Sequence, residues 1–161
     1  MGNPLASATS EATVTRATLL AFLRRHRYAV QSSTHPTGGP QSAVVGIAVS
    51  DRLEIVVDTL DTSRKGRNLR QRPQVAFVLG GVAAGDERTV QYEGVVDEPR
   101  GAERTRLTEL YYAVFPDGRE RLSWPGLIYL RATPRWLRYS DYNQNPPQIV
   151  EFDHAALKEL K

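Results

Sequence analysis

A dense group of basic side chains stands in the segment TSRKGRNLRQRPQVAF (residues 62–77), and no acidic residue interrupts it. Its cations are Arg64, Lys65, Arg67, Arg70 and Arg72. Ser63 can cap a short helix that begins at Arg64 and ends near Arg70, before Pro73. Such a helix start brings together free backbone N–H groups, a hydroxyl group and fixed cations. This combination is typical of a phosphate-binding site.

Within this basic cluster, the first two cations are the best placed to bind a phosphate. Lys65 would supply a compact point charge, and Arg64 could donate two parallel hydrogen bonds to two oxygens. The other three, Arg67, Arg70 and Arg72, lie further along the helix and in the following turn, and we expect them to be solvated. A helix face solvated along its whole length, with no ligand, is the alternative explanation of the cluster.

Other motifs that carry chemistry do not occur in the sequence. The histidines His26, His35 and His154 have no metal-binding spacing, and the chain has no cysteine, so we expect no metal site. No G-x-S-x-G elbow, P-loop or Rossmann glycine pattern is found. A Ser-His-Asp triad assembled from distant residues stays an open alternative. No acid or base stands out, and we name no catalytic residue.

Nucleic acid is another anionic ligand to consider. The formal net charge of +3 permits an anionic ligand but does not require nucleic acid. Small barrels that bind single strands usually place aromatic side chains among their basic residues, and residues 64–72 contain none. A small-barrel nucleic-acid-binding module is therefore disfavoured, and we expect no nucleic acid among the partners.

The segments around these residues must form a fold that positions them. With 161 residues, 40% hydrophobic and 24% charged, the chain suits one domain at residues 13–161, preceded by a flexible tail at residues 1–12. The N-terminus lacks the pattern of a signal peptide. No apolar run approaches the roughly 18 residues of a membrane span. We expect a cytoplasmic protein that contacts no membrane.

Turn residues and β-branched runs predict a mainly β fold. We expect strands at 28–33, 75–79, 88–96 with a bulge at Gly94, and 149–152, together with a hairpin of 41–50 and 53–57. Two further strands, 127–133 and 135–141, are separated by Pro134, and residues 116–126 are irregular. Helices follow Thr15 and Ser63, span 101–115 and begin again near His154. Six or seven strands, mostly in hairpins, favour an antiparallel barrel with peripheral helices.

These segments resemble the pyridoxamine 5'-phosphate oxidase-like superfamily of FMN-binding split barrels. The resemblance runs from about Leu19 to Asp141. It is carried by PQSAVVGIAV, then by LEIVVDTLDTSRKGRNLRQRPQVAFVL, and continues in the same order with TVQYEGVVDEP and WLRYSD. A hairpin, a short linker, Arg-Lys, Asn-Leu and a strand led by proline form the most distinctive part of this pattern.

The resemblance implies a set of cofactor-binding residues. Arg64 and Lys65 match the pair that binds the FMN phosphate. Two strand segments would meet the flavin, one along its ring and one through backbone and hydroxyl groups: Ser42, Ala43, Val44, and Val57, Asp58, Thr59. Thr89 stands where the oxidase has a glutamine that reaches the cofactor, and Tyr139 falls near a tryptophan at the cofactor's edge. The resemblance also implies a homodimer with FMN at the interface, to which Trp124 of the second subunit is a candidate contributor.

Departures from the true oxidase bear on the substrate. Gly46 replaces a lysine that binds the substrate phosphate, and Phe115 stands where a tyrosine is expected. Arg119 and Ser123 keep an R-x-x-x-S spacing, but no Arg-x-His follows Tyr139. We therefore expect no vitamin B6 oxidation. The sequence favours an FMN-dependent oxidoreductase of an unassigned small molecule, and the alternative is a flavin- or deazaflavin-binding carrier without catalysis.

Overall fold

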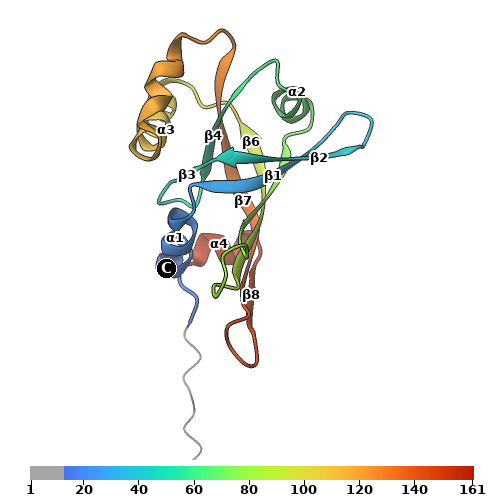
Figure 1. The fold of residues 1–161 in the computed structure, drawn as a ribbon, viewed down its shortest axis with the longest axis vertical. Coiled ribbons are helices and arrows are strands. Elements are labelled where there is room, and N and C mark those ends of the chain that lie inside the picture. Colours follow the sequence, from blue (N-terminus) through green and yellow to red (C-terminus); the bar gives the residue numbers. More distant parts are fainter. Residues whose placement is uncertain (1–12) are drawn as a thin grey trace, which may run out of the picture.

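The computed structural model describes residues 13–161, so the tail predicted at residues 1–12 lies outside the described residues. One antiparallel sheet curls into a split barrel, and helices lie around its outside (Figure 1). Its strands are β1 (Tyr28–Thr34), β2 (Pro40–Gly46), β3 (Ala48–Val49), β4 (Ile55–Leu60), β5 (Gln74–Gly80), β6 (Arg88–Asp97), β7 (Leu127–Asp141) and β8 (Gln148–Phe152). The described chain thus has eight strands, where the sequence predicted six or seven.

The order of the strands explains why the barrel is split. The sheet runs β2-β1-β5-β6-β7-β4-β3, with β8 beside β7. The segment 40–49 changes partner at Ile47: β2 pairs with β1 before it, and β3 pairs with β4 after it. The predicted hairpin of 41–50 with 53–57 therefore exists only at its β3–β4 end. The β2 residues before Ile47 form no ladder with β4, and this missing pairing is the split in the barrel.

The helices begin largely where capping residues predict. They are α1 (Arg16–Arg25), α2 (Arg64–Gln71), α3 (Gly101–Val114) and α4 (His154–Glu159). Thr15 caps α1 and Ser63 caps α2, because each side chain accepts a hydrogen bond from a backbone N–H of the first turn. Residues expected to be irregular instead form a 3₁₀ helix, η1 (Pro116–Ser123).

The prediction that Pro134 separates two strands is wrong, because β7 is continuous through it. Pro134 pairs with Gly94, next to a register shift between Glu93 and Gly94 on β6. The bulge predicted at Gly94 is thus confirmed. Glu93 pairs with Trp136 and Gly94 with Pro134, so the extra residue is Arg135 and the proline lies at the bulge, where the disturbed ladder does not require its hydrogen bond. The long strand can therefore pass through Pro134 without a break.

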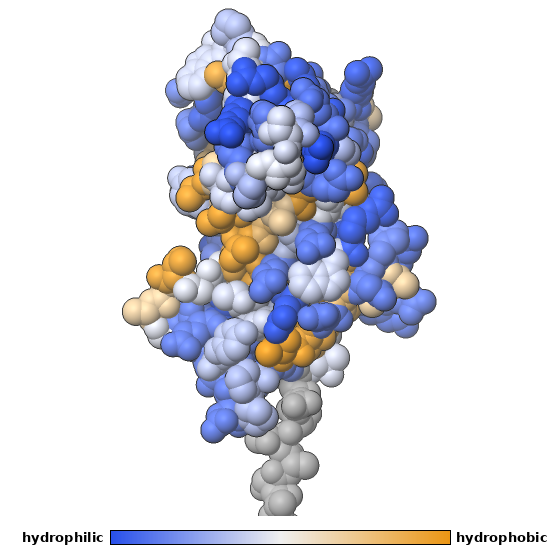
Figure 2. Space-filling view, turned by 90° about the vertical axis from the view of Figure 1, so that its right-hand side faces the viewer, coloured by the Kyte–Doolittle hydropathy of each residue, from blue (hydrophilic) through white to orange (hydrophobic). Residues whose placement is uncertain are grey.

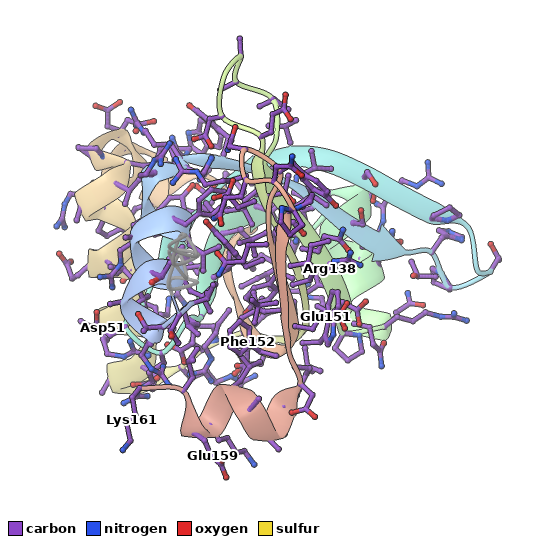
Figure 3. All side chains as sticks on the ribbon, turned by 90° about the horizontal axis from the view of Figure 1, so that it is seen from below. Asp51, Arg138, Glu151, Phe152, Glu159 and Lys161 are labelled. Carbon is purple, nitrogen blue, oxygen red and sulfur yellow. The ribbon has the colours of Figure 1, made fainter. Side chains whose placement is uncertain are left out.

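Two apolar clusters hold the domain together. The larger fills the barrel, and its fully buried members include Leu19, Phe77, Tyr92 and Leu137. Figure 3 shows Phe152 of β8 among these interior side chains, while Arg138 and Glu151 on the neighbouring strands form an ion pair. The smaller cluster lies under α3. None of the helices in the described part of the chain is both long and apolar enough to cross a membrane.

Candidate anion-binding and cofactor site

The start of α2 is fixed to the end of β4 by two hydroxyl groups. The Ser63 side chain accepts a hydrogen bond from the Gly66 N–H at 3.0 Å, and the Thr59 and Ser63 hydroxyls are 2.9 Å apart. Gly66 is required here, because a Cβ at this position would lie 2.7 Å from the Leu60 carbonyl oxygen. The Gly66 N–H is taken by the cap, so the N–H groups of Arg64 and Lys65 are the ones left for a ligand at this helix start.

Two cations that have no partner among residues 13–161 lie at this helix start. Arg64 is exposed and Lys65 half-buried, and neither side chain makes a hydrogen bond or ion pair with the rest of residues 13–161. Together with the helix dipole they make the α2 N-terminus a positively charged site. The structure therefore gives the first two cations the arrangement that the sequence predicted.

The three later cations, Arg67, Arg70 and Arg72, are exposed, as the sequence predicted, and two of them also have partners on the surface. Arg70 binds Glu98 at 2.6 Å and lies 3.6 Å from Asp61. Arg72 donates a hydrogen bond to the Pro36 carbonyl at 2.6 Å. Both side chains are thereby bound on the protein surface. Of these three cations, only Arg67 has no hydrogen bond or ion pair with the described residues, so it is a suitable control for the site.

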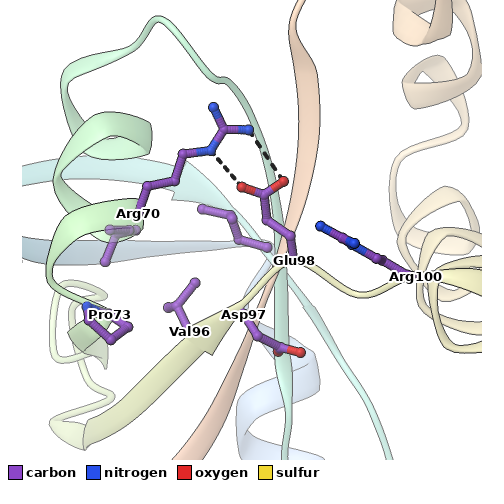
Figure 4. A pocket seen from close by; sticks show the side chains of 8 residues that line it. Arg70, Pro73, Val96, Asp97, Glu98 and Arg100 are labelled. Carbon is purple, nitrogen blue, oxygen red and sulfur yellow. Dashed lines mark hydrogen bonds and ion pairs between the residues drawn. The ribbon is translucent and has the colours of Figure 1, made fainter.

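A hollow of about 450 Å³ lies beside the C-terminal half of α2, and its charged lining residues are Arg70, Asp97, Glu98 and Arg100. Figure 4 shows Arg70 reaching Glu98 across it, with two contacts between the guanidinium and the carboxylate. The hydrogen bond with Glu98 raises the pKa of Arg70 above its usual value. Arg70 is thereby paired with Glu98, whereas Arg64 and Lys65 at the helix start have no ion-pair partner within residues 13–161.

The strand residues predicted to meet the flavin flank the split in the barrel. β2 and β4 lie in contact, and α2 lies over β1 at the same end of the sheet. Along β2, Ser42 and Val44 face outward while Ala43 faces inward, as strand alternation requires. Val44 is 71% exposed, and the Ser42 hydroxyl is 2.8 Å from the Ser32 hydroxyl.

Along β4, the side chains of Val57 and Asp58, which were predicted to lie near the flavin, contact other residues of the protein. Val57 is buried in the core. Asp58 accepts hydrogen bonds from the Tyr111 hydroxyl at 2.7 Å and the Arg121 guanidinium at 2.9 Å. Burial, followed by this contact with Asp58, raises the pKa of Tyr111 well above its usual value. Beyond Val56, β4 pairs with no second strand, so its backbone edge rather than these side chains is open to a ligand.

Thr89 and Tyr139 lie elsewhere. Thr89 pairs with Gly80, at the end of β5 far from α2. Tyr139 is buried in the barrel and packs edge-on against Phe22, with ring centres 5.8 Å apart. A single chain therefore does not bring these two residues to the α2 N-terminus. Trp124 is half exposed, just before Gly126, whose carbonyl accepts the Asp61 N–H.

The residues at positions that depart from the oxidase pattern pack against neighbouring side chains. A Cβ at Gly46 would lie 2.9 Å from the Phe115 ring, so a longer side chain has no room there. Phe115 stacks on Tyr111, and the Arg27 guanidinium lies 4.9 Å from its ring centre. Arg119 is bound to Glu109 at 2.6 Å. These residues form an aromatic cluster under α3 and offer no free cation to an anionic substrate.

Sequence reasoning missed a polar cluster beneath α2. The Asn68 amide donates hydrogen bonds to the Ser33 hydroxyl and to the Gln41 side-chain oxygen, both at 3.2 Å. Asn68 is buried, and the contacts join α2 to both strands of the β1–β2 hairpin. A possible signal was an asparagine in the middle of a helix, where the residue is unfavourable unless its side chain finds a specific partner.

The fold and this site define a class: an antiparallel split barrel with two cations at a helix start beside its opening. The family model of pyridoxamine 5'-phosphate oxidase matches residues 15–140. The chain therefore belongs to the pyridoxamine 5'-phosphate oxidase family. No curated protein matches it in sequence.

Solved structures share the fold at low sequence identity. A heme-binding protein from Mycobacterium smegmatis superposes with a TM-score of 0.75 and 14% identity, over 86% of this chain and only 57% of that protein's length. A pyridoxamine 5'-phosphate oxidase-related, FMN-binding protein from Nostoc punctiforme gives 0.65 and 14%, over 89% and 92% of the two chains. A conserved hypothetical protein from Mycobacterium tuberculosis gives 0.64 and 22%, over 91% and 89%. At these identities the likeness concerns the fold.

Proposed function

We propose that this chain binds FMN at the split between β2 and β4 and works as an oxidoreductase on a small molecule. The observation that carries the proposal is a pair of cations on a capped helix N-terminus, Arg64 and Lys65, that have no partner within the described part of the chain. A phosphate there would accept hydrogen bonds from backbone N–H groups and charge-assisted bonds from both side chains. The residues present thus fit the phosphate end of the cofactor.

The flavin ring would lie against the edges of the split. Ser42 and Val44 supply a hydroxyl and an apolar contact from β2, and the open edge of β4 at 57–59 supplies backbone groups. When bound, FMN supplies the hydride or electron transfer, and the chain binds and orients it. A deazaflavin with a phosphate group would use the same seat, so it is the alternative cofactor.

A flavin or deazaflavin carrier without catalysis is the alternative function within the same site. It differs in one respect, namely that the bound ring would exchange no electrons with a small-molecule substrate at a useful rate. Heme-binding structural neighbours suggest a further ligand to test. The phosphate seat favours FMN, because two cations at a helix start match a terminal phosphate dianion better than heme carboxylates on a flexible stem.

We also propose that the protein is a homodimer whose second copy covers the outer face of β1, β2 and β5. Val30 pairs with Val44 on one side and Val78 on the other, and all three are exposed. Figure 2 shows apolar side chains in a band on the side of the molecule from which the β1–β2 hairpin projects. An apolar row across three strands without a charge is more typical of an interface than of free surface.

The test is a titration of the cofactor-free protein with FMN, followed by quenching of flavin fluorescence. We expect binding, and we expect the double variant Arg64→Ala/Lys65→Ala to weaken it by about 100-fold or more, since each charge-assisted bond contributes roughly 1.5–3 kcal/mol. Arg67→Ala, which removes a cation from the same helix, should change the affinity less than about threefold. Equal FMN affinities of the double variant and the wild type would refute phosphate binding by Arg64 and Lys65.

Two further titrations separate the alternatives. Riboflavin, which lacks the phosphate, should bind the wild type weakly and should not distinguish it from the double variant. Hemin should bind no more tightly than FMN. Tight hemin binding that is indifferent to Arg64→Ala/Lys65→Ala, together with no binding of FMN, would overturn the proposal in favour of a heme-binding function.

A further inference from the structure

We infer that Asn68 is a positioning residue, which fixes the spacing between the phosphate seat on α2 (Arg64 and Lys65) and the flavin strand (residues 42–44 of β2). Through Asn68, α2 connects the two edges of the split. The inference rests on the proposed FMN site and adds to it a reason why the two halves of the cofactor can be bound at once.

The two edges of the split are not joined by backbone pairing. β2 pairs with β1, β4 pairs with β7, and within residues 13–161 the part of β2 before Ile47 has no ladder with β4. Backbone hydrogen bonds between these strands therefore do not set the width of the split where the ligand would lie. That width depends on an element that contacts both edges.

The helix α2 is such an element. At its start, the hydroxyl of the capping residue Ser63 lies 2.9 Å from the Thr59 hydroxyl on β4. Its second half contacts the β1–β2 hairpin, where Arg72 donates a hydrogen bond to the Pro36 carbonyl at 2.6 Å and the Asn68 amide reaches both strands. The helix thus runs from one edge of the split to the other.

Asn68 makes its contact directly beside the flavin strand. Its side-chain nitrogen donates to the Gln41 side-chain oxygen and to the Ser33 hydroxyl, both at 3.2 Å. Ser33 and Gln41 lie opposite each other in the ladder, and the Ser33 hydroxyl donates to the same Gln41 oxygen at 3.3 Å. Gln41 immediately precedes Ser42, so a shift of α2 against the hairpin would reach the flavin strand at the next residue.

Burial makes the Asn68 contact difficult to replace. Asn68 is 1% exposed and Ser33 is 5% exposed, so water cannot take over these hydrogen bonds when they break, and the loss is costly. The contact of Arg72 with Pro36 is exposed, and water can replace it. Asn68, rather than Arg72, is therefore the residue that holds α2 at a fixed distance from β2.

This fixed distance matters for a ligand that has two binding groups. FMN would gain from phosphate contacts on α2 and from ring contacts on β2 together only if the spacing of the two sites matches the cofactor. If α2 were loosened from β2, each half could still bind, but joining the halves would bring less. A residue with a role in stability alone would weaken the binding of both halves equally.

The experiment compares FMN with riboflavin on the cofactor-free protein, using quenching of flavin fluorescence. Asn68→Leu keeps a side chain of similar size without the amide. We expect it to lower the ratio of FMN affinity to riboflavin affinity roughly tenfold, while the riboflavin affinity stays within about threefold of wild type. Inorganic phosphate, followed through the Lys65 backbone amide by ¹⁵N NMR, should bind both proteins equally, whereas Arg64→Ala/Lys65→Ala should lose phosphate binding.

Further variants identify the strand through which Asn68 acts. Gln41→Met removes the acceptor on β2 and should lower the affinity ratio as Asn68→Leu does. Ser33→Ala is the matched control, because it removes the other hydrogen bond of the same amide, and it should change the ratio less than about threefold. The double variant Asn68→Leu/Gln41→Met should lose no more than either single variant, since both remove one contact. Circular dichroism melting shows whether each variant is folded, and Gln41→Met keeps the test decisive if Asn68→Leu is not.

A measurement without flavin separates this inference from the proposed function. Inorganic phosphate should shift the amide resonances of residues 42–44 in the wild type but not in Asn68→Leu. If it does so in a protein that fails to bind FMN, the proposed function is refuted and the coupling of α2 to β2 is retained.

Four outcomes would overturn the inference. Phosphate could leave the resonances of residues 42–44 unchanged in the wild type, or the folded variants Asn68→Leu and Gln41→Met could keep the wild-type affinity ratio. FMN and riboflavin affinities could fall in parallel, which would indicate a role in stability alone. Ser33→Ala could lower the ratio as much as Gln41→Met, which would show that the contact with β2 has no special part.

Discussion

The carboxylate of Asp58 joins three elements beside the proposed flavin site. From β4, its two oxygens accept hydrogen bonds from Tyr111 on α3 and from Arg121 on η1. The side chains of Asp58 and Arg121 are only 16% and 20% exposed, so water screens this ion pair poorly. Asp58 therefore positions α3 and η1 against the strand whose backbone edge faces the split.

Replacing Asp58 by alanine should cost stability before it affects the ligand. The change leaves the Tyr111 hydroxyl unpaired and Arg121 with only Asp117 as counter-ion. We expect the free energy of unfolding, measured by urea denaturation, to fall by about 2–3 kcal/mol. Asp58→Asn keeps an acceptor for Tyr111 and should lose about half as much. A loss below about 0.5 kcal/mol for the alanine variant would show that these contacts do not hold α3 and η1 against β4.

At the scale of single elements, α2 depends on a glycine inside the helix. Helix propensity alone predicts that Gly66→Ala would stabilise α2 by up to about 1 kcal/mol. The structure predicts the opposite, because the new Cβ would lie 2.7 Å from the Leu60 carbonyl oxygen and 3.0 Å from the capping hydroxyl of Ser63. Relieving these contacts would move the helix start away from β4.

We expect Gly66→Ala to lower the free energy of unfolding by about 1–3 kcal/mol. It should also weaken FMN binding, because it displaces the cap and the two cations together. Gly39→Ala is the matched control: no atom lies within 4 Å of the Cβ that it would add, and its change should stay within about 0.5 kcal/mol. A stabilised Gly66→Ala protein would contradict the close approach of β4 and α2.

The elements that could be predicted from sequence are those with local signals. Ser63 and Pro73 frame α2, and Gly94 marks a bulge, because caps, helix breakers and bulges act within a few residues. The continuity of β7 through Pro134 could not be predicted in this way. It depends on Gly94, 40 positions earlier, lying opposite the proline across the ladder.

The candidate site also contains some residues that local sequence signals could place and others whose roles depend on distant partners. The α2 seat is contiguous in sequence, so residue types and spacing were enough to place Arg64 and Lys65. The roles of Asp58 and Arg70 depend on partners far along the chain, Arg121 and Glu98, and no local pattern shows which charges will meet.

At the scale of the whole molecule, we propose that a second copy completes the cofactor site. Val44 belongs both to the flavin strand and to the exposed row that Val30 and Val78 complete. Thr89 and Tyr139, which the family pattern brings toward the cofactor, lie away from the α2 seat in the same chain. A second copy over the row would cover the ring edge, so dimerisation and FMN binding should be coupled.

This coupling can be tested by placing a charge in the centre of the row. Val30→Lys should convert a wild-type dimer to monomer in mass photometry, because an interface core tolerates an unpaired cation poorly. It should also weaken FMN binding, although Val30 lies on β1 and not at the phosphate seat. Ile149→Lys on β8 is the matched control, since its exposure of 44% is close to the 41% of Val30. It should leave both the mass and the FMN affinity unchanged. A wild-type protein that stays monomeric when saturated with FMN would refute the dimer, and a Val30→Lys monomer that binds FMN normally would show that the site is complete in one chain.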